Sequence, residues 1–362
     1  MSADLNLFSP YQLGNNILSN RIVMAPMTRS RAIGNIPNDI MATYYGSRAS
    51  AGLIITEGTS PSPAGLGYAR IPGLYSKEQI AGWKKVTDAV HAKGGHIFVQ
   101  LMHTGRIAHP LNLPEGAVII SASPIAAANT QMHTDQEGMQ PQPVPKEVAT
   151  AEIPGLIAEF VHSAKSAVAA GFDGVELHGA NGYLLEQFLN SATNQRTDQY
   201  GGSIENRNRF VLELAAAVAN AIGKEKTAIR LSPFGVFNEI APDETTEEQY
   251  TQLAAGLKEI GIVYIHVVDH SSMGTPPVPQ STKDAIRKTF GSTIIISGGY
   301  DPQKAEADLE AGKGELVAFG RPFLANPDLV ERFKTNADLA EADQSTFYTP
   351  GEKGYTDYAV LA

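Results

Sequence analysis

Residues 174–183, GVELHGANGY, gather three hydrogen-bonding side chains within one short segment. His178, Asn181 and Tyr183 follow a strand-like run and are separated by small residues, so their polar atoms could face one point. Such donors suit an oxygen atom, particularly one that gains negative charge during a reaction. The same residue types also favour tight turns and helix N-termini, and this purely structural interpretation stays open on the local pattern alone.

The rest of the chain predicts where this segment lies in the fold. Eight short β-branched runs, bounded by Gly or Pro, alternate with amphipathic stretches of helical period: 21–26, 52–58, 96–102, 173–179, 227–233, 264–269, 292–299 and 315–320. Strands that alternate with helices form parallel βαβ units, and eight such units close a barrel. A doubly wound sheet is the alternative, but no G-x-G-x-x-G motif follows the first strand. We therefore expect an α/β fold, the (β/α)8 TIM barrel.

Two segments fall outside this alternation. Residues 1–20 precede the first strand and are expected to form an N-terminal cap on the bottom of the barrel. Residues 107–149, rich in Pro, Ala and Gln, follow the third strand and are too long for an ordinary connection, so we expect an excursion that covers the barrel mouth. Residues 335–362 would form a C-terminal tail, and residues 1–362 a single domain.

Composition and charge exclude several classes of function. The net charge is −10 and Lys and Arg do not cluster in runs, which argues against a nucleic-acid partner. The absence of Cys excludes disulfides, thiolate metal sites and Cys nucleophiles. The first residues, MSADLNLFSPYQLG, do not resemble a secretory signal, and no run approaches about 18 apolar residues. We therefore expect a cytoplasmic protein without a membrane-spanning segment.

Polar and small residues occupy the ends of seven predicted strands, where barrels of this type build their active sites. Gly pairs and an Arg after strands seven and eight suit a phosphate group, which binds backbone N–H groups and a guanidinium. Thr28, Gln100 and Arg230 offer donors to a flat ring with polar atoms at its edge. No carboxylate pair and no activated nucleophile accompany them, which favours a cofactor site. Its expected residues are Pro26, Met27, Thr28, Gly58, Gln100, Arg230, Gly298, Gly299, Gly320 and Arg321.

A metal site, as in metal-dependent barrel hydrolases, is a less favoured alternative. His103, His178, His266 and Asp269 could supply ligands from strands three, four and six. No His-x-His pair follows the first strand, however, and the phosphate-binding residues would be unexplained. His266 lies within an alternating strand and is more simply interpreted as a packed core residue. We therefore expect no metal.

Long segments of the chain also carry a family pattern. They are NRIVMAPMTRSRA (20–32), GLIITEGT (52–59), QLMHTGR (100–106), GFDGVELHGANGYLLEQFLNSATNQRTDQYGGSIENRNRF (171–210), IRLSP (229–233), FGRPFLANPDL (319–329) and GYTDY (354–358). In these segments the chain resembles the old yellow enzyme family of FMN-dependent ene-reductases, and most closely its N-ethylmaleimide reductase and pentaerythritol tetranitrate reductase group. The resemblance covers the chain almost from end to end.

This resemblance implies a single FMN-binding domain and an enzyme that uses NADPH or NADH. Its substrates would be electrophilic alkenes, namely α,β-unsaturated carbonyl compounds such as enones and maleimides, with nitro compounds and nitrate esters as further candidates. The protein would be a monomer or a weak homodimer. A flavin-binding or redox-sensing protein without turnover is the alternative, but binding flavin does not require the set of His178, Asn181 and Tyr183.

The resemblance also implies roles for individual residues. Thr28 would bind the flavin O4, and Gln100 and Arg230 would hold the pyrimidine edge of the ring. Gly299, Gly320 and Arg321 would bind the phosphate.

On the substrate side, His178 and Asn181 would bind the carbonyl oxygen and Tyr183 would supply a proton. Tyr68 and Tyr355 would be pocket aromatics. Met102 stands where relatives often carry a bulky Trp, so the resemblance does not define the size of the substrate or its pose.

Overall fold

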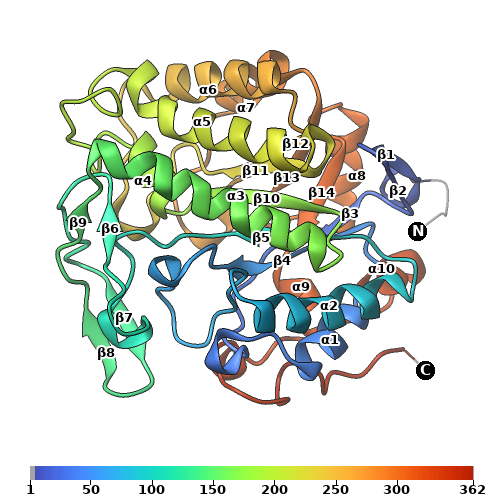
Figure 1. The fold of residues 1–362 in the computed structure, drawn as a ribbon. Helices are drawn as coiled ribbons and strands as arrows, with labels where there is room; N and C mark the ends of the chain where they lie inside the picture. Colours follow the sequence, from blue (N-terminus) through green and yellow to red (C-terminus); the bar gives the residue numbers. More distant parts are fainter. Residues whose placement is uncertain (1–4, 362) are drawn as a thin grey trace.

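The computed structural model describes residues 5–361; residues 1–4 of the expected cap and residue 362 of the expected tail lie outside the described part. Eight parallel strands close a barrel (Figure 1), and β14 returns to pair with β3. The barrel strands are β3 (Ile22–Met24), β4 (Leu53–Thr59), β5 (Ile97–Leu101), β10 (Gly174–Gly179), β11 (Thr227–Leu231), β12 (Tyr264–Val268), β13 (Thr293–Ser297) and β14 (Leu316–Phe319). Each falls within or overlaps one predicted run, which confirms the predicted (β/α)8 fold.

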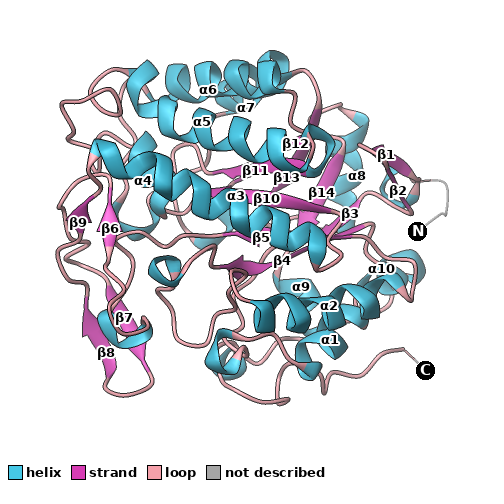
Figure 2. Ribbon diagram, in the orientation of Figure 1, coloured by secondary structure: helices cyan, strands magenta, loops and turns pink. Residues whose placement is uncertain are grey.

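Helices surround the strands (Figure 2). They are α1 (Asp39–Gly46), α2 (Lys77–His91), α3 (Ile153–Ala169), α5 (Ile204–Ile222), α6 (Thr246–Ile260), α7 (Gln280–Phe290), α8 (Pro302–Glu310) and α10 (Leu329–Thr335), with the short α4 (Leu184–Leu189) and α9 (Arg321–Ala325) after β10 and β14. In α2, Ser76 and Gln79 form a capping box, and Trp83 is fully buried. None of the described helices is long and apolar enough to cross a membrane.

A hairpin of β1 (Tyr11–Leu13) and β2 (Asn16–Leu18) precedes the barrel. Its Leu13 and Leu18 are buried in one cluster with Leu53 and Leu316, the first residues of β4 and β14. The hairpin therefore packs on the amino end of the barrel, opposite the carboxyl ends of the strands.

The excursion between β5 and α3 forms two small sheets. Strands β7 (Gln131–Thr134) and β8 (Gly138–Pro141) make an antiparallel hairpin, and β6 (Ile120–Ser121) pairs in parallel with β9 (Lys146–Glu147). Ile107, Ala127 and Met132 of the excursion pack together, and the side chains of Tyr68 and Tyr183 lie against them. The excursion thus contacts two residues expected at the site.

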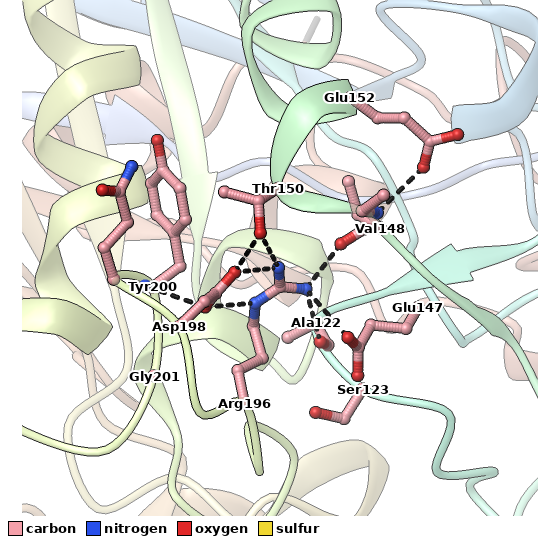
Figure 3. Close-up of polar contacts among 12 residues, drawn as sticks. Ala122, Ser123, Glu147, Val148, Thr150, Glu152, Arg196, Asp198, Tyr200 and Gly201 are labelled. Atoms are coloured by element: carbon pink, nitrogen blue, oxygen red, sulfur yellow. Dashed lines mark hydrogen bonds and ion pairs between the residues drawn. The ribbon is translucent and has the colours of Figure 1, made fainter.

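One buried arginine attaches the base of the excursion to the loop after α4 (Figure 3). Arg196 Nη1 donates hydrogen bonds to the carbonyl oxygens of Ala122 (3.1 Å) and Val148 (2.6 Å). Its Nε and Nη2 donate to the carboxylate of Asp198 at 3.0 and 2.5 Å. Because this guanidinium bridges segments far apart in the sequence, it holds the excursion at Ala122 and Val148 against the loop after α4.

Candidate active site

A cavity of about 670 Å³ opens at the carboxyl ends of the barrel strands. Its walls come from the segments that follow every barrel strand except β5, from Arg230 on β11, and from Phe347 and Tyr348 in the tail. A volume of this size suits a cofactor or a drug-sized ligand. Eight of the ten predicted cofactor residues line it: Pro26, Met27, Thr28, Arg230, Gly298, Gly299, Gly320 and Arg321.

Glycines shape one end of the cavity, after β13 and β14. Gly298 and Gly299 have φ values of 141° and 63°, which side chains rarely allow. A Cβ atom on Gly298 would lie 2.5 Å from the carbonyl oxygen of Asp269, and one on Gly299 would lie 2.4 Å from Cβ of Ser272. The chain therefore needs glycine at both positions. With Gly320 and Arg321, these glycines line one end of the cavity with backbone N–H groups and a guanidinium, which can bind an anionic group.

Arg230 supplies a buried positive charge to the same cavity. Within the described residues its Nε has no hydrogen-bond partner, although the atom is fully buried. Burial lowers the pKa of Arg230 from its ordinary value, but a guanidinium stays protonated in proteins. A buried cation with incomplete partners is costly unless a ligand completes them. These donors fit the electron-rich edge of a flavin ring.

Beneath this wall lies a fully buried polar network centred on Glu176. Gln100 Nε2 donates to Glu176 Oε1 (2.8 Å), while Tyr264 (3.0 Å) and His266 Nδ1 (2.9 Å) contact Oε2. Burial raises the pKa of Glu176, but His266, followed by Arg230, outweighs it, and the pKa lies below its ordinary value. Gln100 therefore belongs to a layer below the cavity lining, and His266 is the packed core residue that its strand pattern suggested. Strand-end positions do not identify Glu176, but an acidic residue inside an otherwise apolar strand indicates a buried polar network.

The opening segment forms a left-handed turn at the cavity. Asn181 and Gly182 have φ values of 61° and 76°, a conformation that Asn and Gly tolerate best. The N–H of Asn181 donates to Ser232 Oγ (2.9 Å), and Asn238 Nδ2 donates to the Asn181 carbonyl oxygen (2.8 Å). The turn ends at Tyr183, the residue before α4.

The turn brings the three predicted catalytic side chains together, with one difference between them. Asn181 and Tyr183 line the cavity. His178 is buried behind this lining, and its ring packs edge-on against that of Tyr183, with 5.0 Å between centroids.

Both rings are neutral at neutral pH. Burial, reinforced by the charge of Arg230, holds the pKa of His178 well below its ordinary value. Burial likewise raises the pKa of Tyr183, so its phenol keeps its proton. The hydroxyl groups of Tyr183 and Tyr68 lie 2.8 Å apart, and both residues line the cavity. The arrangement presents neutral hydrogen-bond donors beside one buried cation.

Tyr355 was wrongly expected in the pocket. It is fully buried, stacks on Tyr44 with 3.9 Å between ring centroids, and lies under the guanidinium groups of Arg29 and Arg31. Phe347 and Tyr348, earlier in the same tail, line the cavity instead. The tail therefore does supply aromatic residues to the cavity, but they are Phe347 and Tyr348 and not Tyr355.

Met102 and Gly58 also lie away from the cavity lining, contrary to expectation. Met102 is buried with Leu66 and Ile71. A Cβ atom on Gly58 would lie 2.5 Å from Sδ of Met102. Gly58 therefore makes room for Met102 behind the wall, and neither residue borders the cavity.

The cavity also has lining residues that strand-end reasoning did not name: Phe237, Asn238, His270, Ser272, Met273 and Tyr300. His270 directly follows the run predicted as the sixth strand, so the same rule, applied to that strand, identifies it. No group of three or more His, Asp or Glu side chains in the described chain is placed to hold a metal ion.

Comparisons with known proteins agree with this geometry. The model of the NADH:flavin oxidoreductase / NADH oxidase family matches residues 6–340. The chain is 42% identical to 12-oxophytodienoate reductase 7 of Oryza sativa subsp. japonica, over 98% of this chain and 94% of that protein. A solved structure of morphinone reductase in complex with tetrahydroNAD is similar with a TM-score of 0.94 and 44% identity, covering 99% of this chain and 98% of the other.

The old yellow enzyme homologue of Zymomonas mobilis is similar with a TM-score of 0.93 and 39% identity, covering 98% of this chain and all of the other. The predicted family resemblance, FMN cofactor and nicotinamide-dependent activity are thereby confirmed. The chain belongs to the NADH:flavin oxidoreductase / NADH oxidase family and is an FMN-dependent oxidoreductase of the old yellow enzyme type.

Proposed function

We propose that the protein reduces the activated C=C bond of α,β-unsaturated carbonyl compounds with electrons from NADPH or NADH. One observation carries this proposal: a single cavity combines a glycine-lined anion end, the buried cation Arg230, and the neutral donors Asn181 and Tyr183 of the turn at 178–183. When bound, FMN supplies hydride transfer between the nicotinamide and the substrate. The donors of the turn are not needed to hold such a cofactor, and this favours turnover over flavin binding alone.

On the cofactor side, we infer that Thr28 and Arg230 bind the ring, while Gly299, Gly320 and Arg321 hold the phosphate. Gln100 would act from the layer below, because Glu176 engages its Nε2 and leaves its oxygen free to accept a hydrogen bond. The other residues assigned to the cradle are Pro26, Met27 and Gly298, with Gly58 supporting it from behind through Met102.

On the substrate side, His178 and Asn181 would donate hydrogen bonds to the carbonyl oxygen. Negative charge grows on this oxygen as the β-carbon is reduced, and each preorganised donor at such a position contributes about 3–4 kcal/mol. Tyr183, kept protonated by burial, would deliver a proton to the α-carbon. Tyr68 would border the substrate beside it, since their hydroxyl groups are hydrogen-bonded.

All of these groups belong to one chain. We therefore also infer a single functional domain over 1–362. We further infer that the protein is cytoplasmic and that it is a monomer or a weak homodimer. In it the excursion at 107–149 supports the mouth of the site through its contacts with Tyr68 and Tyr183.

The decisive experiment is anaerobic reoxidation of the reduced holoprotein by 2-cyclohexenone. We expect single-turnover oxidation in the wild type and at least a ~100-fold slower rate in the double variant His178→Ala, Asn181→Ala. Both proteins should retain FMN and bind it in the same amount. A reduced wild-type protein that 2-cyclohexenone does not oxidise would instead indicate a flavin-binding protein without this activity.

A further inference from the structure

His270 is hydrogen-bonded to the turn at 178–183. It lies in the loop after β12, and its Nε2 is 2.8 Å from Oδ1 of Asn181. Its ring also packs edge-on against Phe237, with 4.6 Å between centroids. Both His270 and Asn181 line the cavity. Packing therefore holds the imidazole at the amide of Asn181.

The backbone of Asn181 is already fixed by other residues. Its N–H is bound by Ser232 and its carbonyl oxygen by Asn238. What remains free is the rotation of the side-chain amide, which decides whether oxygen or nitrogen faces the cavity. Among the described residues, His270 is the sole hydrogen-bond partner of this amide.

The structure places the amide oxygen of Asn181 toward His270 Nε2, an arrangement that corresponds to the ring tautomer with its N–H on Nε2. A side-chain amide has an oxygen that accepts and a nitrogen that donates two hydrogen bonds. Burial, with the charge of Arg230, lowers the pKa of His270 to about 4, so the ring is neutral at pH 7 and carries one N–H. When this N–H is on Nε2 it occupies the amide oxygen of Asn181, and the Nδ2 protons are left for the cavity.

We propose that His270 is a positioning residue that turns the amide of Asn181 so that its N–H groups face the carbonyl oxygen of the substrate. This inference rests on the proposed function, because it specifies how one of the two oxygen-binding groups acquires its donor orientation. His270 itself does not touch the reacting atoms in this scheme. It acts by removing the alternative in which Asn181 presents an acceptor, which would repel a substrate oxygen.

Two variants separate the donor from the ring. His270→Phe keeps an aromatic ring against Phe237 but removes the N–H, whereas His270→Gln retains an N–H donor that can reach Asn181 Oδ1. The probe is phenol bound as the phenolate anion, whose oxygen carries negative charge like the oxygen of a substrate during reduction. Its dissociation constant is measured on the oxidised holoprotein from the change in FMN absorbance.

We expect His270→Phe to weaken phenol binding by about tenfold or more, and His270→Gln by less than about threefold, because one hydrogen bond to a charged acceptor is at stake. FMN content and melting temperature should stay at the wild-type values in both. If the Phe variant does not retain FMN, His270→Leu, which also lacks a donor, takes its place in the comparison.

A double-variant cycle tests whether His270 acts through Asn181. In the Asn181→Ala background, His270→Phe should cause no further loss of phenol binding, since the group it positions is gone. Additive losses, or wild-type binding in His270→Phe while Asn181→Ala binds poorly, overturn the inference and leave the proposed function standing. Wild-type phenol binding in Asn181→Ala would overturn the oxygen-binding role of Asn181 itself, and the inference with it.

Discussion

Two buried arginines illustrate the difference between a structural region and a binding region of this molecule. Arg196, at the base of the excursion, donates to two carbonyl oxygens and to both oxygens of Asp198 (Figure 3). Arg230, on the cavity wall, has a buried Nε without a hydrogen-bond partner among the described residues. Burial is similar, but only one guanidinium is satisfied by the protein. The satisfied group holds the fold together, and the other is available to a ligand.

The largest effect is expected at the satisfied arginine. Arg196→Ala removes the N–H groups that donate to the carbonyl oxygens of Ala122 and Val148. It also removes the cation beside Asp198, which holds the pKa of that carboxyl well below its ordinary value. A buried carbonyl oxygen left without its donor costs about 1–3 kcal/mol, and two are left here; the lost ion pair adds less, because Asp198 is partly exposed. The free energy of unfolding, measured by urea denaturation of the apoprotein, should fall by about 2 kcal/mol or more. A loss below about 1 kcal/mol would mean that Arg196 does not stabilise the fold and would contradict its structural role.

The opposite pattern is expected for Arg230→Met. The apoprotein should lose less stability than in Arg196→Ala, because Arg230 has a buried Nε without a hydrogen-bond partner among the described residues, although its charge also favours the ionised form of Glu176. FMN affinity should fall by about 100-fold, since hydrogen bonds from a charged group are lost. Titration of the apoprotein with FMN and a parallel urea curve measure both quantities. Unchanged FMN affinity would show that Arg230 does not contact the cofactor.

Tyr183 is an intermediate case, because its hydroxyl group is hydrogen-bonded to Tyr68 and the residue also borders the cavity. Tyr183→Phe removes the proton but keeps the ring. Oxidation of the reduced protein by 2-cyclohexenone should slow, whereas oxidation by a nitrate ester, which needs no proton at an α-carbon, should not. The two rates should diverge by more than about tenfold. Equal slowing would make Tyr183 a packing residue, and no slowing would point to water as the acid.

The smallest effect concerns Glu186, a buried carboxyl group that accepts hydrogen bonds but forms no ion pair with the described residues. Glu186 accepts from the N–H of Gly182, from Ser232 and from Tyr250, and burial raises its pKa to about 7. Between pH of about 5 and 7 the folded protein retains a proton that the unfolded chain has released. The contribution of Glu186 to the free energy of unfolding should therefore decrease as pH rises through this window. Buried His103 and His270, whose pKa values are lowered to about 3 and about 4, contribute with the opposite sign.

A matched variant isolates this contribution. In Glu186→Gln this contribution is absent, so the change in the free energy of unfolding from pH 5 to pH 7 should be more positive than in the wild type by about 1 kcal/mol or more, as measured by urea denaturation across this range. Glu57, another buried carboxyl group whose pKa is raised to about 7, contributes in the same direction as Glu186 and is unchanged in the variant. An identical pH dependence in wild type and variant would mean that Glu186 is solvated in the folded protein.

Much of the fold and half of the site follow from the sequence alone, for a physical reason. Eight β-branched runs alternating with amphipathic helices have one common closed arrangement, and closure brings every strand end to one rim. Thr28, Arg230, Gly299 and Arg321 could therefore be assigned to one cavity without knowledge of any contact. Local spacing also sufficed for Asn181 and Tyr183, since both belong to a single turn.

Only the tertiary structure decided which residues of the long connections reach the cavity. The tail follows a path set by buried donors elsewhere in the chain: Arg29 Nη2 binds the carbonyl oxygen of Gly354 (2.7 Å) and Arg31 Nη1 that of Phe347 (2.8 Å). These bonds direct Phe347 and Tyr348 toward the cavity and bury Tyr355. The pairing of His270 with Asn181 has the same origin. Such contacts join residues that no periodicity relates, so they exist only once the barrel has closed.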